Sequence, residues 1–204
     1  MRTASCIGPA HATAYAVYLH GMDGVSPSGQ EMQNRAILAS MASKLSMRVA
    51  LPRATARCPN QPSSICWGWT FDEREVHEGA TTIDAAARSC FGEKAFALIG
   101  FSNGGYLLTK MLRSCVLPST LPRVTQLVTS GSTMMKEPLE REPSSLAGCG
   151  KLTMLIGDKD EFNFDPTGTL LHGLQRKGAD VREVRFEGTH LLSEEPLMRV
   201  LSSF

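Results

Sequence analysis

The chain lacks the features that mark several large classes of protein. Its 204 residues contain no apolar stretch long enough to cross a membrane, no internal repeat and no low-complexity tract. The formal net charge is +1 and no run of Lys and Arg occurs, which argues against a nucleic-acid-binding surface. No group of Cys and His residues has the spacing of a metal site. With 42% hydrophobic and 20% charged residues the composition is that of a globular protein, and we expect a single domain over 1–204.

Short apolar runs alternate with segments of helical periodicity along the whole chain. The strands are expected at 15–19, 48–52, 95–99, 125–130, 152–156 and 181–186, and the helices at 31–45, 81–91, 105–112, 166–177 and from Ser193 onward. Two polar segments are expected outside these elements: 72–79, which is charged and solvated, and 136–145, a loop or short irregular helix. Such alternation favours an α/β fold with a mostly parallel, doubly wound sheet of about six strands and helices on both faces.

The most informative stretch runs from Ala95 to Leu112. A buried strand there leads into Gly100-Phe101-Ser102-Asn103-Gly104, and a helix follows. A turn of this kind holds the serine backbone in a strained conformation with its hydroxyl exposed, and the two glycines are needed because side chains at their positions would collide. The N-terminus of the following helix favours a developing negative charge. The five-residue pattern also arises by chance, so its partners elsewhere in the chain decide its meaning.

Three other loops follow strands and should lie at the same sheet edge, because ligands of parallel sheets bind beyond the carboxyl ends of the strands. The first strand runs into His20-Gly21-Met22, where the N–H of Met22 can complete an oxyanion hole with the N–H of Asn103. We interpret His20 as a structural histidine and assign the function of this loop to its backbone. The two later loops supply acidic residues and His190.

A serine hydroxyl attacks a carbonyl at neutral pH only with an imidazole as general base, which a carboxylate orients. Of the five histidines, His11 precedes the fold and His172 falls within a helix, whereas His190 follows a late strand and comes after the acidic loop. Four acidic residues compete for the remaining role: Asp158, Asp160, Glu161 and Asp165.

The order serine, acid, histidine resembles that of the α/β-hydrolase superfamily. The matching features are Leu19-His20-Gly21, the turn at Ser102, Gly157 followed by Asp160, and Gly188-Thr189-His190. The resemblance covers nearly the whole chain from about Tyr15, and it implies a serine hydrolase without a cofactor. By the spacing that the family uses after Gly157, it assigns the acid to Asp160, with Asp158 as the alternative.

The chain also departs from the superfamily pattern. It begins directly at the strand before His20-Gly21, so we expect the usual leading antiparallel strands to be missing. Between Ser130 and Leu152 there is too little chain for a helical lid, so we expect an open site and no lid domain. An open site suits a polymeric ester as well as a small one.

Both tryptophans, Trp67 and Trp69, lie in the long loop after the second expected strand. They either anchor this loop on the body of the protein or line a substrate pocket, since the loop leaves the same sheet edge as the serine turn. The segment Cys66-Trp67-Gly68-Trp69 is similar to the Cys-Trp-x-Trp stretch of feruloyl esterases and secreted polyhydroxybutyrate depolymerases, which are small esterases without a lid.

Six cysteines are either reduced residues of an intracellular protein or a set of disulfides. Cys58 and Cys66 share one loop, whereas the other four each precede an expected strand and should lie near the sheet edge opposite the serine. We hypothesise three bridges: Cys58–Cys66, Cys6–Cys90 and Cys115–Cys149. Disulfides imply a secreted or periplasmic protein, with a cytoplasmic one as the alternative, although the first residues lack the apolar core of a signal peptide.

The sequence therefore predicts an ester hydrolase with Ser102 as nucleophile, His190 as base and Asp160 as acid. The substrate is a small-molecule or polymeric ester, and neither nucleic acid nor a membrane span is expected. A thioesterase or serine peptidase would use the same residues, and a binding module that kept the fold would use none of them. The sequence does not predict acyl or alcohol specificity or the oligomeric state.

Overall fold

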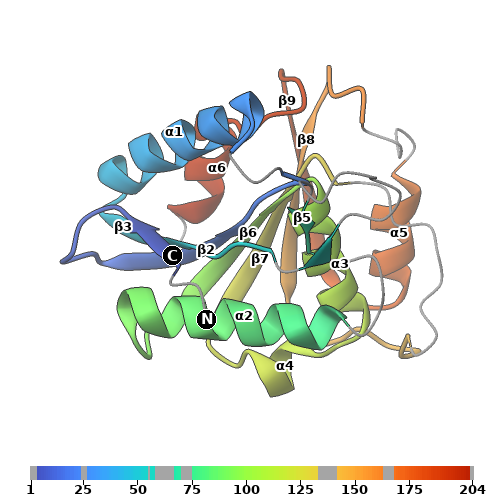
Figure 1. Cartoon of the computed structure of the whole chain (residues 1–204). Helices are drawn as coiled ribbons and strands as arrows, with labels where there is room; N and C mark the ends of the chain where they lie inside the picture. Colours follow the sequence, from blue (N-terminus) through green and yellow to red (C-terminus); the bar gives the residue numbers. More distant parts are fainter. Residues whose placement is uncertain are drawn as a thin grey trace.

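A mostly parallel seven-stranded sheet with helices on both faces forms the body of the protein (Figure 1). The computed structural model describes residues 4–23, 27–54, 56–57, 67–69, 75–132, 142–162 and 168–202. The sheet has the strand order β1-β3-β2-β6-β7-β8-β9, in which every neighbouring pair is parallel except β1 and β3. The predicted α/β fold class is therefore confirmed.

The elements have the following bounds. The strands of the main sheet are β1 (Ser5–Ile7), β2 (Ala14–Leu19), β3 (Met47–Leu51), β6 (Phe96–Phe101), β7 (Val124–Ser130), β8 (Lys151–Gly157) and β9 (Asp180–Phe186). Two short strands, β4 (Ala56–Arg57) and β5 (Trp67–Gly68), pair antiparallel in a separate small sheet. The helices are α1 (Gly29–Lys44), α2 (Glu75–Phe91), α3 (Asn103–Arg113), α4 (Leu117–Thr120), α5 (Thr169–Arg176) and α6 (Glu194–Leu201).

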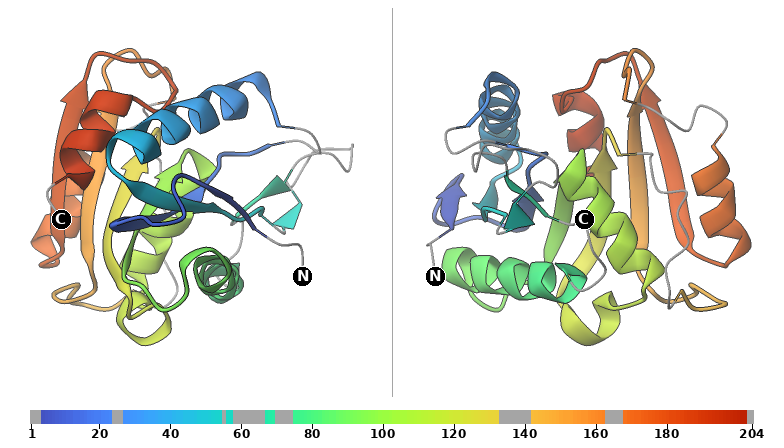
Figure 2. Two further views of the ribbon diagram at one scale, coloured as in Figure 1. Left: turned by 90° about the vertical axis from the view of Figure 1, so that its left-hand side faces the viewer. Right: turned by 45° about the vertical axis from the view of Figure 1, so that its right-hand side comes forward.

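Successive residues of a buried strand point to opposite layers of the fold. In β2, Val17 and Leu19 pack in the layer that contains α2, α3 and α5, whereas Ala16 and Tyr18 pack in the layer of α1 and α6. The two layers are visible on either side of the sheet in Figure 2. Within the part of the chain that the structure describes, no helix combines the length and apolar character that crossing a bilayer requires.

Two features differ from the sequence-based expectations. A leading antiparallel strand is present after all, because β1 pairs with β3 in the register Ser5 to Leu51. Helix α2 begins at Glu75 rather than near Thr81, because Val76 and Ala80 continue the buried stripe of Ile83 and Ala87 one turn further toward the N-terminus. The charges of the segment 72–79 suggested a loop, yet exposed charges such as Glu78 only cover the outer face of the helix. The short helix α4 was also absent from the prediction.

Two of the three hypothesised disulfides are confirmed. Cys6 of β1 bonds to Cys90 in the last turn of α2, and Cys115 after α3 bonds to Cys149 before β8. Cys6 lies within a strand rather than before one. The third hypothesised bridge, Cys58–Cys66, lies outside the described residues.

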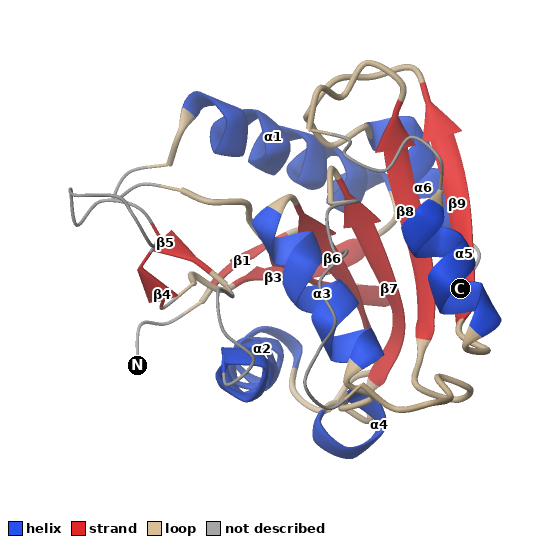
Figure 3. Cartoon of the chain, turned by 90° about the vertical axis from the view of Figure 1, so that its right-hand side faces the viewer, coloured by secondary structure: helices blue, strands red, loops and turns tan. Residues whose placement is uncertain are grey.

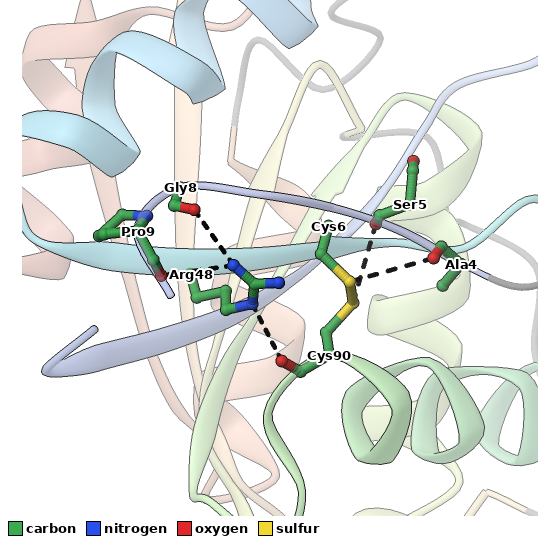
Figure 4. The surroundings of a disulfide bond; sticks show 7 residues. All are labelled: Ala4, Ser5, Cys6, Gly8, Pro9, Arg48 and Cys90. Carbon is green, nitrogen blue, oxygen red and sulfur yellow. Dashed lines mark hydrogen bonds between the residues drawn. A yellow bond between two sulfur atoms is a disulfide. The ribbon is translucent and has the colours of Figure 1, made fainter. Parts of the chain in front are cut away.

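An arginine supports the first of these bridges. Arg48 of β3 donates from Nε to the carbonyl oxygen of Cys90 at 3.0 Å, and from Nη1 to the carbonyl oxygens of Gly8 and Pro9 at 3.2 and 3.4 Å (Figure 4). A three-residue edge strand forms few hydrogen bonds of its own. The disulfide and Arg48 together hold β1 against the sheet.

We predict that removing Cys6–Cys90 destabilises the protein more than removing Cys115–Cys149. The sequence separations are 84 and 34, and the entropy lost by the unfolded chain grows with the length of the closed loop. Each pair of Cys→Ser substitutions should lower the free energy of unfolding by about 2–4 kcal/mol, and the two losses should differ by about 0.8 kcal/mol. Urea denaturation of the two double variants measures this difference. A larger loss for the shorter loop would contradict the expectation.

Candidate active site

The carboxyl ends of the parallel strands bring the predicted site residues to one edge of the sheet. Ser102 follows β6, Met22 follows β2, Asp160 follows β8 and His190 follows β9. Figure 3 shows α3 with its N-terminal end next to the carboxyl end of β6.

The turn at Ser102 is strained. Its φ of 50° and ψ of −117° lie in a region that L-residues rarely adopt. The backbone is held there by the bond from the N–H of Ser102 to the carbonyl of Ser130 at 2.8 Å. A Cβ on Gly100 would lie 2.7 Å from the carbonyl oxygen of Gly104, and a Cβ on Gly104 would lie 2.3 Å from the carbonyl oxygen of Leu19. Only glycine therefore fits at these two positions.

Asp160 and His190 form a hydrogen-bonded pair. Nδ1 of His190 lies 3.0 Å from both carboxylate oxygens of Asp160. The side chains are 3% and 12% exposed, so the pair is largely shielded from water. The N–H of Phe162 also donates to Oδ1 of Asp160 at 2.9 Å. A carboxylate in this position holds the imidazole as the tautomer with its proton on Nδ1, which leaves Nε2 able to accept a proton.

The competing acids lie elsewhere. Asp158 is exposed and its Oδ1 accepts from the N–H of Gly188 at 3.0 Å, so it braces the loop that carries His190 instead of touching the ring. Glu161 is also exposed, and Asp165 lies outside the described residues.

Aromatic rings flank the imidazole of His190. The centroid of Phe101 lies 4.8 Å from it and that of Phe162 lies 4.6 Å from it. Phe101 directly precedes Ser102, so its contact places the base beside the serine turn. Burial and the nearby Asp160 carboxylate raise the pKa of Tyr106, in the second turn of α3, to about 12. Sequence reasoning did not single out these three aromatic residues, although Phe101 and Phe162 stand one and two positions from predicted site residues.

The loop after β2 lies directly against the serine. A Cβ on Gly21 would be 3.2 Å from Cβ of Ser102, so this glycine allows the close approach. His20 is 2% exposed; its Nδ1 bonds to the carbonyl oxygen of Gly21 and its Nε2 accepts from the N–H of Ala54 at 3.1 Å. Only a neutral imidazole with its proton on Nδ1 satisfies both bonds.

The bond to Gly21 fixes the direction of the Met22 amide. In a trans peptide the carbonyl and the N–H of the next residue point in opposite directions. Because the Gly21 carbonyl points to His20, the Met22 N–H points away from that ring. The Met22 side chain is 56% exposed.

Asn103 connects the serine turn with the tryptophan segment. It is the first residue of α3, where helix N–H groups point out of the helix end, and its Oδ1 accepts from the N–H of Trp69 at 2.6 Å. The Trp69 side chain is 4% exposed, and its ring centroid lies 5.4 Å from that of His20. Trp69 is thus buried beside His20, which agrees with a role in anchoring this segment on the body of the protein. Trp67 is the first residue of β5.

Comparison with solved structures identifies the fold. The chain is similar to a carboxylesterase from Mesorhizobium loti, with 17% identity, a TM-score of 0.69, and coverage of 98% of this chain and 94% of that one. It is similar to Zea mays acyl-protein thioesterase 2, with 15% identity, a TM-score of 0.68, and coverage of 98% and 96%. It is also similar to an alpha-beta serine hydrolase homologue from Coxiella burnetii, with 16% identity, a TM-score of 0.57, and coverage of 97% and 86%.

These likenesses show that the chain has the α/β-hydrolase fold, so the predicted resemblance is confirmed for the fold. No protein-family model and no curated protein matches the sequence.

The two candidate acids can be separated by mutation. We predict that Asp160→Asn lowers kcat by about 10³- to 10⁴-fold, because an amide in this position favours the wrong tautomer of His190. Asp158→Asn should leave kcat within about threefold of wild type, since the asparagine keeps an Oδ1 that can accept from the Gly188 N–H and this side chain does not bond to the imidazole. Steady-state kinetics of the two isosteric variants tests the assignment, and the reverse ranking would move the acid to Asp158.

The buried His20 predicts a pH dependence of stability. Burial lowers the pKa of His20 below its ordinary value of 6.5. Below about pH 6.5 the unfolded chain therefore binds a proton that the folded chain does not bind at this position, and stability falls as the pH decreases. The contribution of one such group is at most about 1.4 kcal/mol per pH unit. Between pH 5 and 8, the free energy of unfolding measured by urea denaturation should fall more steeply with decreasing pH for wild type than for His20→Gln. Equal slopes for the two proteins would refute the lowered pKa of His20.

Proposed function

We propose that this chain is a serine hydrolase that cleaves carboxylic esters through an acyl-enzyme. The observation that carries the proposal is the shielded Asp160–His190 pair, at the sheet edge where Ser102 occupies a strained turn. The α/β-hydrolase fold supports it, since the solved structures to which this one is similar include carboxylesterases.

Acylation follows from the roles of these groups. Oγ of Ser102 attacks the acyl carbonyl carbon while Nε2 of His190 takes the hydroxyl proton. The carbonyl oxygen becomes an oxyanion, which the N–H groups of Met22 and Asn103 stabilise. Collapse of the tetrahedral intermediate breaks the ester bond, and the alcohol leaves with the proton that His190 returns.

Deacylation repeats the cycle with water. His190 takes a proton from the attacking water, the second tetrahedral intermediate collapses, and Oγ of Ser102 leaves with the proton from Nε2. Asp160 stays ionised throughout and stabilises the imidazolium in both halves.

A thioester is the second candidate substrate. The similarity to an acyl-protein thioesterase of Zea mays, at a TM-score of 0.68, favours it. The same nucleophile, base and oxyanion donors attack a thioester carbonyl, so the two functions differ only in the leaving group and in what surrounds it.

We also propose that the protein works in an oxidising compartment, either secreted or periplasmic. The bridges Cys6–Cys90 and Cys115–Cys149 support this, because such bonds persist mainly outside the cytosol. The site is proposed to be open: none of the described residues between β7 and β8, 131–132 and 142–150, is helical. We propose that the described segment with Trp67 and Trp69 borders the substrate site, because the N–H of Trp69 donates to Oδ1 of Asn103, the residue after Ser102.

Hydrolysis of p-nitrophenyl esters, from acetate to a long acyl chain, tests the function. Turnover by wild type should fall roughly 10⁶-fold in Ser102→Ala, because the nucleophile is lost while the oxyanion donors remain. Ser43→Ala, an exposed serine of α1, is the matched control and should behave as wild type. Acyl thioesters measured in parallel decide between the two leaving groups. Turnover that survives in Ser102→Ala would overturn the proposal.

A further inference from the structure

Helix α1 contacts the loop that carries His190 at two places in its first two turns. Nε2 of Gln30 donates to the carbonyl oxygen of His190 at 2.8 Å. Oδ1 of Asn34 accepts from the N–H of Leu192 at 2.9 Å. Residues four apart lie on one face of a helix, so a single face of α1 holds the backbone on both sides of Leu191. Figure 1 shows α1 beside the segment that connects β9 to α6.

Asn34 belongs to a buried polar network. It is 0% exposed, and its Nδ2 donates to the hydroxyl of Tyr18 at 3.4 Å. That hydroxyl donates to Oε2 of Glu31 at 2.9 Å, and Oε1 of Glu31 accepts from Nε of Arg35 at 2.8 Å. Burying an amide, a phenol and a carboxylate costs free energy that an apolar core would not cost. The network ends at the backbone N–H of Leu192, two residues after the base.

We propose that Gln30 and Asn34 are positioning residues, which hold the His190 backbone so that its imidazole faces both Asp160 and Ser102. The proposal rests on the proposed function of His190 as general base. Asp160 fixes the ring from one side through Nδ1, and the rings of Phe101 and Phe162 restrict its tilt. These contacts hold only the side chain. The bonds from α1 fix the backbone from which that side chain projects, and neither Gln30 nor Asn34 needs to touch the substrate.

Gln30→Ala is the main test, because Gln30 is exposed and its loss should leave folding intact. We expect kcat on the best ester to fall by about 5- to 20-fold with KM within twofold, since a small displacement of the base slows proton transfer without weakening binding. Gln33→Ala, the same change at an exposed position of the same helix, is the control and should match wild type. Asn34→Leu should lower kcat by at least as much as Gln30→Ala. This variant is assayed under conditions in which its circular dichroism spectrum shows that it is folded.

A second readout does not depend on turnover. In protein labelled with ¹⁵N-histidine, the proton on Nδ1 of His190 should give a low-field resonance, assigned by its loss in His190→Gln. In Gln30→Ala this proton should exchange with water faster, whereas Gln33→Ala should leave it unchanged.

The two readouts separate the possible failures. If no ester is turned over in a Ser102-dependent way, the proposed function fails, and faster exchange in Gln30→Ala would still support the positioning role. If Gln30→Ala keeps kcat within twofold of wild type and an unchanged Nδ1 proton, the positioning role is wrong.

Discussion

The architecture depends on how closely the backbone at Gly104 approaches the end of β2. A single Cβ at this position would lie 2.3 Å from the carbonyl oxygen of Leu19, and one at Gly100 would press into the start of α3. This contact joins the two central strands to the first turn of a helix. It places Ser102 against Gly21, and so the loop after β2 and the turn after β6 become one site. The strain at Ser102 persists because the closely packed backbone around it and the bond from its N–H to the Ser130 carbonyl hold the turn.

At the carboxyl edge of the sheet, several buried side chains form hydrogen bonds with the backbone of the loops and not with each other. His20 binds the Gly21 carbonyl and the Ala54 amide, Asn103 binds the Trp69 amide, and Asn34 binds the Leu192 amide. A loop at a sheet edge has backbone groups that no ladder satisfies; His20 supplies two partners, and Asn103 and Asn34 supply one each. The same bonds that satisfy the backbone also fix its direction. Stability and the geometry of the site are thus produced by the same interactions.

Sequence reasoning recovered what local patterns encode. The six parallel strands were predicted because short segments rich in apolar residues end at glycine, proline or polar residues. The serine turn was predicted because side chains at its two glycine positions would collide with the backbone. Strand β1 was missed because three residues carry no pattern, and its position depends on pairing with β3 and on a bridge to Cys90. The start of α2 differs from the expectation because its charged residues, read without the tertiary structure, suggest a solvated segment, although the solvent-facing side of a helix carries such charges.

In the site, too, local sequence patterns predicted some features, whereas others depend on tertiary contacts. Order along the chain placed an acidic loop before His190, and the spacing that the family uses after Gly157 favoured Asp160, with Asp158 as the alternative. Which of the two reaches the imidazole depends on the direction of each side chain in a turn, and there Asp158 faces the Gly188 amide. Gln30 and Asn34 left no signal in the sequence, because their partners lie 160 and 158 residues away and are backbone atoms, which any residue provides.

The bridge between Cys6 and Cys90 has a consequence for the integrity of the chain. It closes a covalent ring that contains β2, α1, β3 and most of α2, together with the loop that lies against the serine turn. A protease that cuts once anywhere between the two cysteines leaves both pieces linked. Such a nicked molecule keeps its mass apart from one added water, and it separates into fragments only when the disulfide is reduced. Because of this covalent ring, a single proteolytic cut in a loop between Cys6 and Cys90 does not release either fragment.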